Sequence, residues 1–267
     1  MTNFYQQISE LEKSNQPFAV ATVVKTDGSV PGKTGFKMIV KNNGAAAGTV
    51  GGGALEVEVI KEAGRRLSGG ESGLKEYLLS DKPDLKETGV TVIPMKCNGR
   101  VSIFFEVHGR LTTIYIFGGG HVGHALLHYL APLNYHTILV DNREEFASPE
   151  KNPGAGEYVF SEYSEYAESF TPDTGAFAVV LTHSHKYDYG ILQTIYKRKL
   201  NLKYVGVIAS KSKAAVMISD LKKDLKDKLD LSDLHTPIGL KIGGSTAGEI
   251  ALSVAAEIQA VRYGKKV

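Results

Sequence analysis

Short apolar runs dominate the first 108 residues and predict strands around one main helix. The main helix is expected over 54–67, where Leu55, Val59 and Ala63 recur at every fourth position and mark one buried stripe. A shorter amphipathic helix is expected over 3–15. Strands are expected at residues 18–24, 36–40, 75–79, 90–93 and 100–107. This mixture predicts a small α+β domain over residues 1–108.

From residue 109 to residue 267, strand and helix patterns alternate. Strands are expected at residues 114–117, 136–140, 157–160, 176–182, 204–209 and 237–242. Helices are expected at residues 122–131, 187–199, 211–228 and 246–262. Such alternation is typical of a parallel sheet with helices on both faces. The last helix is the best supported, because Thr246 and Glu249 have the spacing of a capping box. We therefore predict an α/β fold, with a Rossmann-type C-terminal domain over 109–267.

A glycine-rich hexapeptide, GGGHVG at residues 118–123, separates the first of these strands from the first helix. Its G-x-G-x-x-G spacing is the dinucleotide-binding fingerprint. Gly118 would allow a tight turn, Gly120 the close approach of a phosphate, and Gly123 close packing of the helix on the strand. Asp141 ends the next strand, where a carboxylate can accept from a ribose 2′-hydroxyl. The same turn can also be a purely structural joint.

Polar residues gather at the ends of the predicted parallel strands, the edge at which open sheets bind their ligands. In chain order they are residues 118–123, Asp141, His183, His185, Ser210, Lys211 and residues 243–246. We interpret them as one shared cleft, in which His121 and Ser210 join the glycines and Asp141 in binding a cofactor. Ordinary polar loops are the alternative.

Residues 182–188, THSHKYD, partly match the metallo-β-lactamase zinc pattern H-x-H-x-D-H. The match fails because Asp188 comes one position late and Gly190 follows where another histidine would be needed. We therefore predict no metal site. Instead, one of His183 and His185 is expected to point into the cleft, where it would be a candidate proton donor.

The N-terminal domain offers two further candidates. Gly51, Gly52 and Gly53 precede the helix at 54–67, and such a helix start suits either an anion or a tight packing turn. Cys97, the single cysteine, stands between Lys96 and Asn98 in a loop between two strands. This setting favours a reactive, exposed thiol, although lone cysteines are often buried as small apolar residues.

Composition narrows the classes of partner. The chain has 31 basic and 29 acidic residues, and this near balance gives no reason to expect nucleic acid or a membrane as partner. No apolar run approaches the ~20 residues of a membrane span, and the N-terminus lacks the core of a signal peptide. One cysteine leaves no intrachain disulfide, so we expect a cytoplasmic protein.

Together these motifs resemble the XdhC/CoxI family, the accessory proteins of xanthine dehydrogenase and related molybdenum hydroxylases. The matching stretches follow the order of the family and cover most of the chain. They are residues 21–24, 28–31, 48–53 with Glu56, 97–99, 118–123, 140–143, 181–185, 208–211, 237–240 and 249–258. Two positions depart from the family pattern. Asn98 stands where glycine is frequent, and Ala54 stands where many relatives carry cysteine. The change at Ala54 removes one possible sulfur or metal ligand and argues against a mechanism that needs two thiols per chain.

The resemblance implies an XdhC N-terminal domain, a Rossmann C-terminal domain, and a homodimer. It implies a chaperone rather than a catalyst, which binds molybdenum cofactor (molybdopterin), protects it during sulfuration by a sulfurtransferase, and hands it to the apo molybdenum hydroxylase. Cys97 matches a family cysteine and is the candidate active thiol. The alternatives are an NAD(P)-dependent oxidoreductase with the same glycine turn, or a nucleotide-sensing module.

Overall fold

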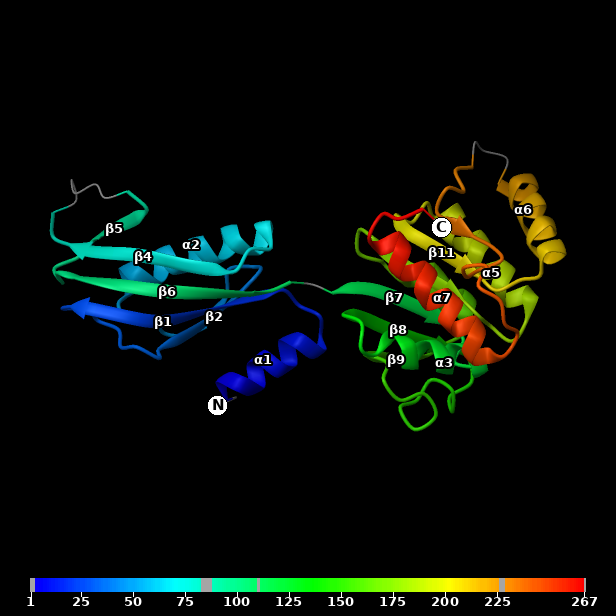
Figure 1. Cartoon of the computed structure of the whole chain (residues 1–267), viewed down its shortest axis with the longest axis horizontal. Helices are drawn as coiled ribbons and strands as arrows, with labels where there is room; N and C mark the ends of the chain where they lie inside the picture. The colour runs from blue at the N-terminus through cyan, green and yellow to red at the C-terminus, as the bar shows by residue number, and fades with distance from the viewer. Residues whose placement is uncertain (1–2, 83–87, 110, 226–228, 267) are drawn as a thin grey trace. The chain divides into compact units, whose positions relative to one another are not determined.

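The computed structural model describes residues 3–82, 88–109, 111–225 and 229–266. It divides the chain into two compact units, Met1–Arg110 and Leu111–Val267 (Figure 1). The expected boundary, between 108 and 109, lies just before this division.

The N-terminal unit is built on a six-stranded sheet in the order β3-β2-β1-β6-β4-β5. Strands β4 and β5 pair in parallel, and the other neighbours pair antiparallel. The strands are β1 (Phe18–Gly28), β2 (Lys37–Lys41), β3 (Ala46–Gly48), β4 (Gly73–Ser80), β5 (Val90–Pro94) and β6 (Gly99–His108). Two helices, α1 (Phe4–Lys13) and α2 (Gly53–Gly69), complete the unit.

The side chains of β1 alternate between two hydrophobic clusters, one packed against α1 and the other against α2. Ala19 and Val23 belong to the cluster that includes Leu55 on α2, whereas Val20 belongs to a separate cluster with Leu11 on α1. Successive side chains of a strand point to opposite faces, so α1 and α2 pack on opposite faces of the sheet. The predicted stripe on α2 is confirmed, because its three residues are fully buried.

The C-terminal unit has six parallel strands in the order β12-β11-β10-β7-β8-β9. They are β7 (Thr112–Phe117), β8 (Tyr135–Asp141), β9 (Glu157–Phe160), β10 (Ala176–Val180), β11 (Leu202–Val207) and β12 (Leu234–His235). The chain starts at the centre with β7, runs outward through β8 and β9, and returns to β10 on the other side of β7. This is the doubly wound order, with its switch point between β7 and β10.

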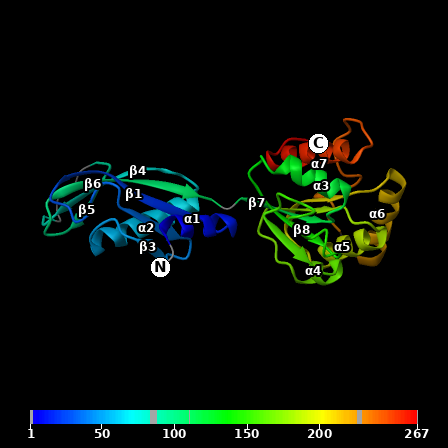
Figure 2. The same cartoon turned by 90° about the horizontal axis from the view of Figure 1, so that it is seen from below.

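Helices cover both faces of this sheet, as predicted (Figure 2). One face carries α3 (His121–Leu130) and α7 (Ala247–Arg262), which bury Leu126 and Val254. The other carries α4 (Tyr163–Ser169), α5 (His185–Lys197) and α6 (Lys211–Leu225). The capping box of α7 is confirmed, because the Thr246 side chain accepts from the Glu249 N–H.

Strand β3 was not predicted, and two further local predictions were incomplete or wrong. The strand expected at 237–242 is absent, and β12 lies just before it. Ile238 of that stretch is buried against α7, and Gly239 has a φ of 96°. The apolar residues of the stretch 237–242 therefore belong to a loop that packs on the core. Helix α4 was not predicted, because seven residues are too few to show a helical period. Residues 226–228, the end of one expected helix, lie outside the described residues.

A buried carboxylate ties α2 to β4. Glu62, which is 8% exposed, accepts from Arg65 at 2.8 Å, Arg66 at 2.8 Å and Lys75 at 3.2 Å. Arg66 also donates to the Leu74 carbonyl of β4. The hydrogen bond from Arg65, supported by Lys75 and Arg66, outweighs desolvation and lowers the pKa of Glu62 from 4.5 to about 2.

This cluster predicts a specific acid sensitivity. A carboxylate with a lowered pKa in the folded chain stabilises it above the unfolded pKa near 4.5, and that stabilisation is lost as the pH falls towards about 2. Wild type should be more stable than Glu62→Gln by on the order of 2 kcal/mol at neutral pH, and the difference should shrink in acid. Denaturant titrations across that range measure it.

The control is Glu58→Gln, since Glu58 pairs only with the exposed Lys61 among the described residues. This variant should follow the wild-type acid profile. A Glu62→Gln profile parallel to that of wild type at every pH would contradict the prediction.

Candidate functional site

The glycine turn between β7 and α3 lies at the switch point of the sheet. Gly118 has a φ of 116°, and a Cβ there would lie 2.4 Å from the Leu181 carbonyl oxygen. A Cβ on Gly123 would lie 2.0 Å from the Gly118 oxygen. At Gly120, by contrast, no described atom beyond its immediate chain neighbours would lie within 4 Å of a Cβ. Gly118 and Gly123 are therefore required for packing, whereas the backbone at Gly120 is open to an approaching ligand.

Asp141 supports the turn from the end of β8. It is fully buried, and one carboxylate oxygen accepts from the Gly119 N–H at 2.8 Å. Arg143 adds its Nε at 2.9 Å, a terminal guanidinium nitrogen at 2.8 Å and its backbone N–H at 3.0 Å. Burial raises the pKa of Asp141, but these hydrogen bonds outweigh it and leave the pKa below its ordinary value.

Four hydrogen bonds thus occupy both oxygens of Asp141, which is about the acceptor capacity of a carboxylate. A ribose hydroxyl would reach this carboxylate only by displacing Arg143. The ribose-binding role of Asp141 stays a prediction, and the role visible in the structure is to hold the turn.

Asn152, which sequence reasoning missed, holds the turn from the other side. Its side-chain amide donates to the Gly119 carbonyl at 3.0 Å and to the Phe146 carbonyl at 2.6 Å, and the residue is fully buried. It lies in a loop outside every motif, so no sequence signal marks it. Together Asp141 and Asn152 bind both the N–H and the carbonyl of Gly119.

The start of α3 is left open by this arrangement. Gly120 is the N-cap residue, and no side chain among the described residues caps the helix there. The first N–H groups of a helix have no partner within it and carry a partial positive charge. His121, the first helical residue, is exposed beside them. The turn can therefore receive an anion such as a phosphate.

The loop after β10 lies against the glycine turn, because the Leu181 N–H donates to the Phe117 carbonyl at 2.8 Å. His183 follows, exposed, with its ring centroid 5.2 Å from that of Tyr187. The structure thus places His183 close along the chain to the switch point. Its role as a proton donor stays a prediction.

His185 and Ser210 lie further along the same edge of the sheet. His185 begins α5, with Nδ1 3.6 Å from the buried Asp188 carboxylate and Nε2 in contact with Lys213 Nζ. Burial raises the pKa of Asp188, against the opposing effect of hydrogen bonds from Thr182. Ser210 accepts from the Lys213 N–H at 3.3 Å, as an N-cap residue does.

The start of α7, by contrast, already holds a carboxylate. Glu249 accepts from the N–H groups of Ser245 and Thr246, both at 2.9 Å. Residues 243–246 therefore bind a side chain of their own helix, and the strand expected to place them at the carboxyl edge of the sheet is absent.

In the N-terminal unit, three loops converge at the start of α2. They follow β1, precede α2 and join β5 to β6. The Ser29 N–H donates to the Asn98 carbonyl at 3.0 Å. A Cβ on Gly52 would lie 3.1 Å from Met95 Cε, and one on Gly32 would lie 2.2 Å from the backbone before α2. Contacts this close explain why glycine occurs in these motifs.

Cys97 lies in the third of these loops and has no disulfide partner. It is half-buried, and part of its surface packs on the core. Gly52 is the N-cap of α2, and no described side chain caps that helix start. Glu56 in the first turn accepts from the Thr49 hydroxyl at 2.5 Å. The thiol and an uncapped helix start thus share one cluster of loops.

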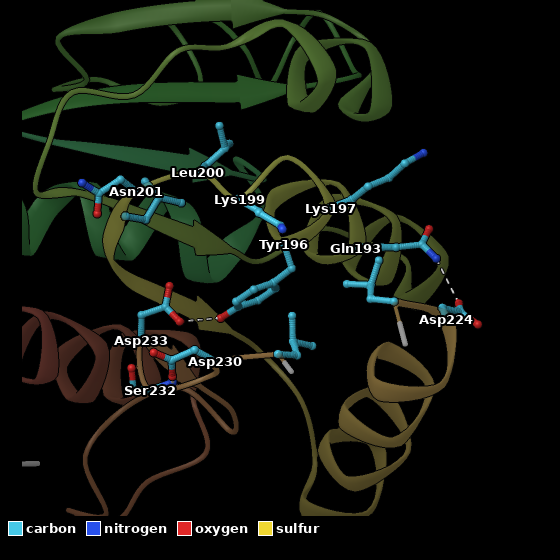
Figure 3. Close-up of a pocket in the computed structure, with 13 residues that line it drawn as sticks. Gln193, Tyr196, Lys197, Lys199, Leu200, Asn201, Asp224, Asp230, Ser232 and Asp233 are labelled. Atoms are coloured by element: carbon cyan, nitrogen blue, oxygen red, sulfur yellow. Dashed lines mark hydrogen bonds between the residues drawn. The ribbon is translucent and has the colours of Figure 1, made fainter. Parts of the chain in front are cut away.

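A cavity of about 1140 Å³ lies at the amino end of β11 (Figure 3). Tyr196 donates to Asp233 there at 2.8 Å, and Gln193 to Asp224 at 2.9 Å. Doubly wound sheets bind their ligands at the carboxyl ends of the strands. No predicted site residue lines this cavity among those the structure describes, and it is not the candidate site.

Within the described residues, no group of three or more His, Cys, Asp or Glu side chains is arranged to hold a metal ion. Among the same residues, no helix has the length and apolar character needed to cross a membrane.

The fold and the turn define a Rossmann-type protein with an additional α+β domain. A family model described as the XdhC Rossmann domain matches residues 114–258, and one described as the XdhC and CoxI family matches residues 11–78. This chain belongs to the XdhC family, as its motifs predict.

Its relatives differ in length. "Uncharacterized protein YqeB" of Escherichia coli (strain K12) is 29% identical over 265 residues, or 97% of this chain and 46% of that protein. The chain thus spans about half the length of YqeB. A probable xanthine dehydrogenase subunit from Bacillus subtilis (strain 168) is 23% identical over 332 residues, with 97% of both chains covered. The crystal structure of a xanthine dehydrogenase from Bacillus halodurans has the same fold, with a TM-score of 0.52 and 19% identity over 98% of this chain and 96% of that one.

The support of the turn by Asp141 can be tested by substitution. Asp141→Asn leaves Arg143 half-buried without its carboxylate and weakens the bond from Gly119. Breaking a buried ion pair costs about 3 kcal/mol, and denaturant titration should show a loss of this order. Glu168→Gln, an exposed change on α4, is the control. A loss no larger than that of the control would mean that Asp141 does not hold the turn.

Proposed function

We propose that this chain serves the maturation of xanthine dehydrogenase or a related molybdenum hydroxylase, by binding molybdenum cofactor and delivering it to the apo-enzyme. Membership of the XdhC family supports the proposal, as do the names of the Bacillus relatives, which refer to xanthine dehydrogenase. In this proposal a sulfurtransferase is a further partner, and the protein acts in the cytoplasm as a homodimer.

The observation that carries the proposal is the open backbone at Gly120 above the uncapped start of α3. Molybdopterin carries a phosphate, and free N–H groups at a helix start suit that group. Arg143, 32% exposed beside this turn, is paired with Asp141 and neutralises its charge, so the carboxylate does not repel an anion there. The N–H groups would bind and orient the cofactor, while the oxidation chemistry that molybdenum supplies belongs to the hydroxylase that receives it.

Cys97, in the N-terminal unit, is a separate candidate for contact with the cofactor. A thiolate is a soft ligand that suits molybdenum or a transferable sulfur. Its loop packs beside the uncapped start of α2, which offers further N–H groups to an anion. Each unit of the chain thus contributes one motif cluster to the proposed activity.

The first test is Gly120→Val. Since no described atom lies near the added Cβ, the fold should persist, while the branched side chain occupies the approach to the turn. Affinity for isolated molybdenum cofactor should fall about tenfold or more, as for the loss of hydrogen bonds to a charged group. Gly64→Ala on α2, where a Cβ also meets no described atom, is the control.

The same titration with NADH and NADPH separates the alternatives. Binding of molybdenum cofactor that is lost in Gly120→Val supports the proposal. Binding of a nicotinamide nucleotide in the absence of cofactor binding would instead favour the oxidoreductase. Unchanged cofactor affinity in a folded Gly120→Val protein would show that the turn is a structural joint.

The second test is Cys97→Ser, which replaces sulfur by a similar but harder atom. The half-buried position should accept serine with little loss of stability, because the volume hardly changes. The variant should fail to retain cofactor and to activate an apo-hydroxylase, and bound cofactor should protect wild-type Cys97 from a thiol reagent. Normal activation by Cys97→Ser would assign Cys97 to core packing.

A further inference from the structure

A second cavity, of about 350 Å³, lies between α5 and α6. Helix α5 contributes His185 and Tyr189, one turn apart, and α6 contributes Lys213, Met217 and Asp220 along one face. We call this cavity the α5/α6 groove. Neither the residues of the glycine turn nor Cys97 line this groove, so the proposed function does not account for it.

One end of the groove is suited to an anion. His185 Nδ1 faces the Asp188 carboxylate, and the tautomer with hydrogen on Nδ1 leaves Nε2 to accept from Lys213. An ammonium group has three donors, so Lys213 keeps two for a ligand. Ser212 lines the same end, at the start of α6, where the helix dipole also favours negative charge.

The other end carries a carboxylate. Asp220 follows Lys213 by two helical turns, or about 10 Å along α6. It is exposed and forms no hydrogen bond with the described residues, whereas Asp224, one turn further, accepts from Tyr189 at 2.7 Å and Gln193 at 2.9 Å. A carboxylate with both oxygens available can accept two adjacent N–H donors.

Between these ends the walls are apolar. The Tyr189 ring is held in place by its bond to Asp224, and Met217 is buried beneath. An aromatic ring and a thioether favour a flat, aromatic ligand. The groove is therefore suited to an anion at one end, a planar ring in the middle and paired N–H donors at the other end.

We propose that the α5/α6 groove binds a phosphorylated bicyclic ring with a 2-amino-4-oxopyrimidine edge, with phosphate at Lys213 and that edge at Asp220. Guanine nucleotides and phosphorylated pterins share this chemistry and have about the required length. A guanine nucleotide would be a second ligand of the chain, while a pterin would be bound at a site separate from the glycine turn. The inference goes beyond the proposed function and does not depend on molybdenum.

The experiment is calorimetric titration of the full chain with GMP, with IMP, which lacks the 2-amino group, and with 6-hydroxymethylpterin phosphate. Wild type should bind GMP or the pterin phosphate, and GMP more tightly than IMP. Lys213→Met should weaken GMP and IMP alike by about tenfold or more, because it removes a charged donor to the phosphate. Asp220→Asn should abolish the preference for GMP over IMP. Both residues are exposed, so neither change should affect folding.

Lys222→Met, on the opposite face of α6, is the control and should bind as wild type does. Tighter binding of the pterin phosphate would assign the groove to a pterin, and tighter binding of GMP would assign it to a nucleotide. Wild type that binds neither GMP nor the pterin phosphate overturns the proposal, and so does binding that survives both substitutions. Because Gly120→Val leaves the groove intact, failure of the groove proposal is distinguishable from failure of the proposed function.

Discussion

A buried charge holds the glycine turn against the carboxyl edge of the parallel sheet in the C-terminal unit. Asp141 has no exposed surface, and an ionised carboxylate in such a place is tolerated only when it is paired and hydrogen-bonded. Arg143 and the Gly119 N–H meet that requirement. The carboxylate therefore ties β8 to the turn between β7 and α3. The open backbone at Gly120 depends on this support, because a turn that moved could not present its N–H groups in one direction.

The helix starts of this chain divide into closed and open ones. Helices α1 and α7 begin with complete capping boxes, in which their own side chains satisfy the first N–H groups. Helices α2 and α3 have Gly52 and Gly120 as their N-cap residues, and no described side chain caps either of them. Helices α4 and α5 also begin without a side-chain cap from the described residues, so what distinguishes α2 and α3 is the glycine at the N-cap position. Glycine thus has two effects at these positions: it permits close backbone contact, and it leaves the helix start free for an anion.

The two units reach a similar arrangement by different means. In the C-terminal unit, side chains fix the turn, with Asp141 and Asn152 on either side of Gly119. In the N-terminal unit, backbone contacts bring three loops together around Gly32 and Gly52, and Cys97 lies among them. The charged cluster at Glu62 lies towards the other end of α2 and anchors that helix to β4. The charged cluster that anchors α2 to β4 is therefore separated along the helix from the glycine loops at its start.

Local patterns in the sequence determined most of the elements. The stripe of Leu55, Val59 and Ala63, the capping box at Thr246 and the strand–glycine–helix order at 114–131 each depend on residues that are close in the chain, so periodicity and sterics were enough to predict them. The same order predicted the parallel sheet with helices on both faces.

Only the tertiary structure decided how distant residues meet. No local sequence signature predicts that Arg143 takes up the acceptor sites of Asp141, or that Asn152 binds the Gly119 carbonyl. None predicts that the three N-terminal loops converge. The stretch at 237–242 shows the reverse case, since its apolar residues resemble a strand but Ile238 packs against α7 as part of a loop. The physical reason is that burial and hydrogen bonding are settled by the partners a residue finds in space, and these partners come from other parts of the chain.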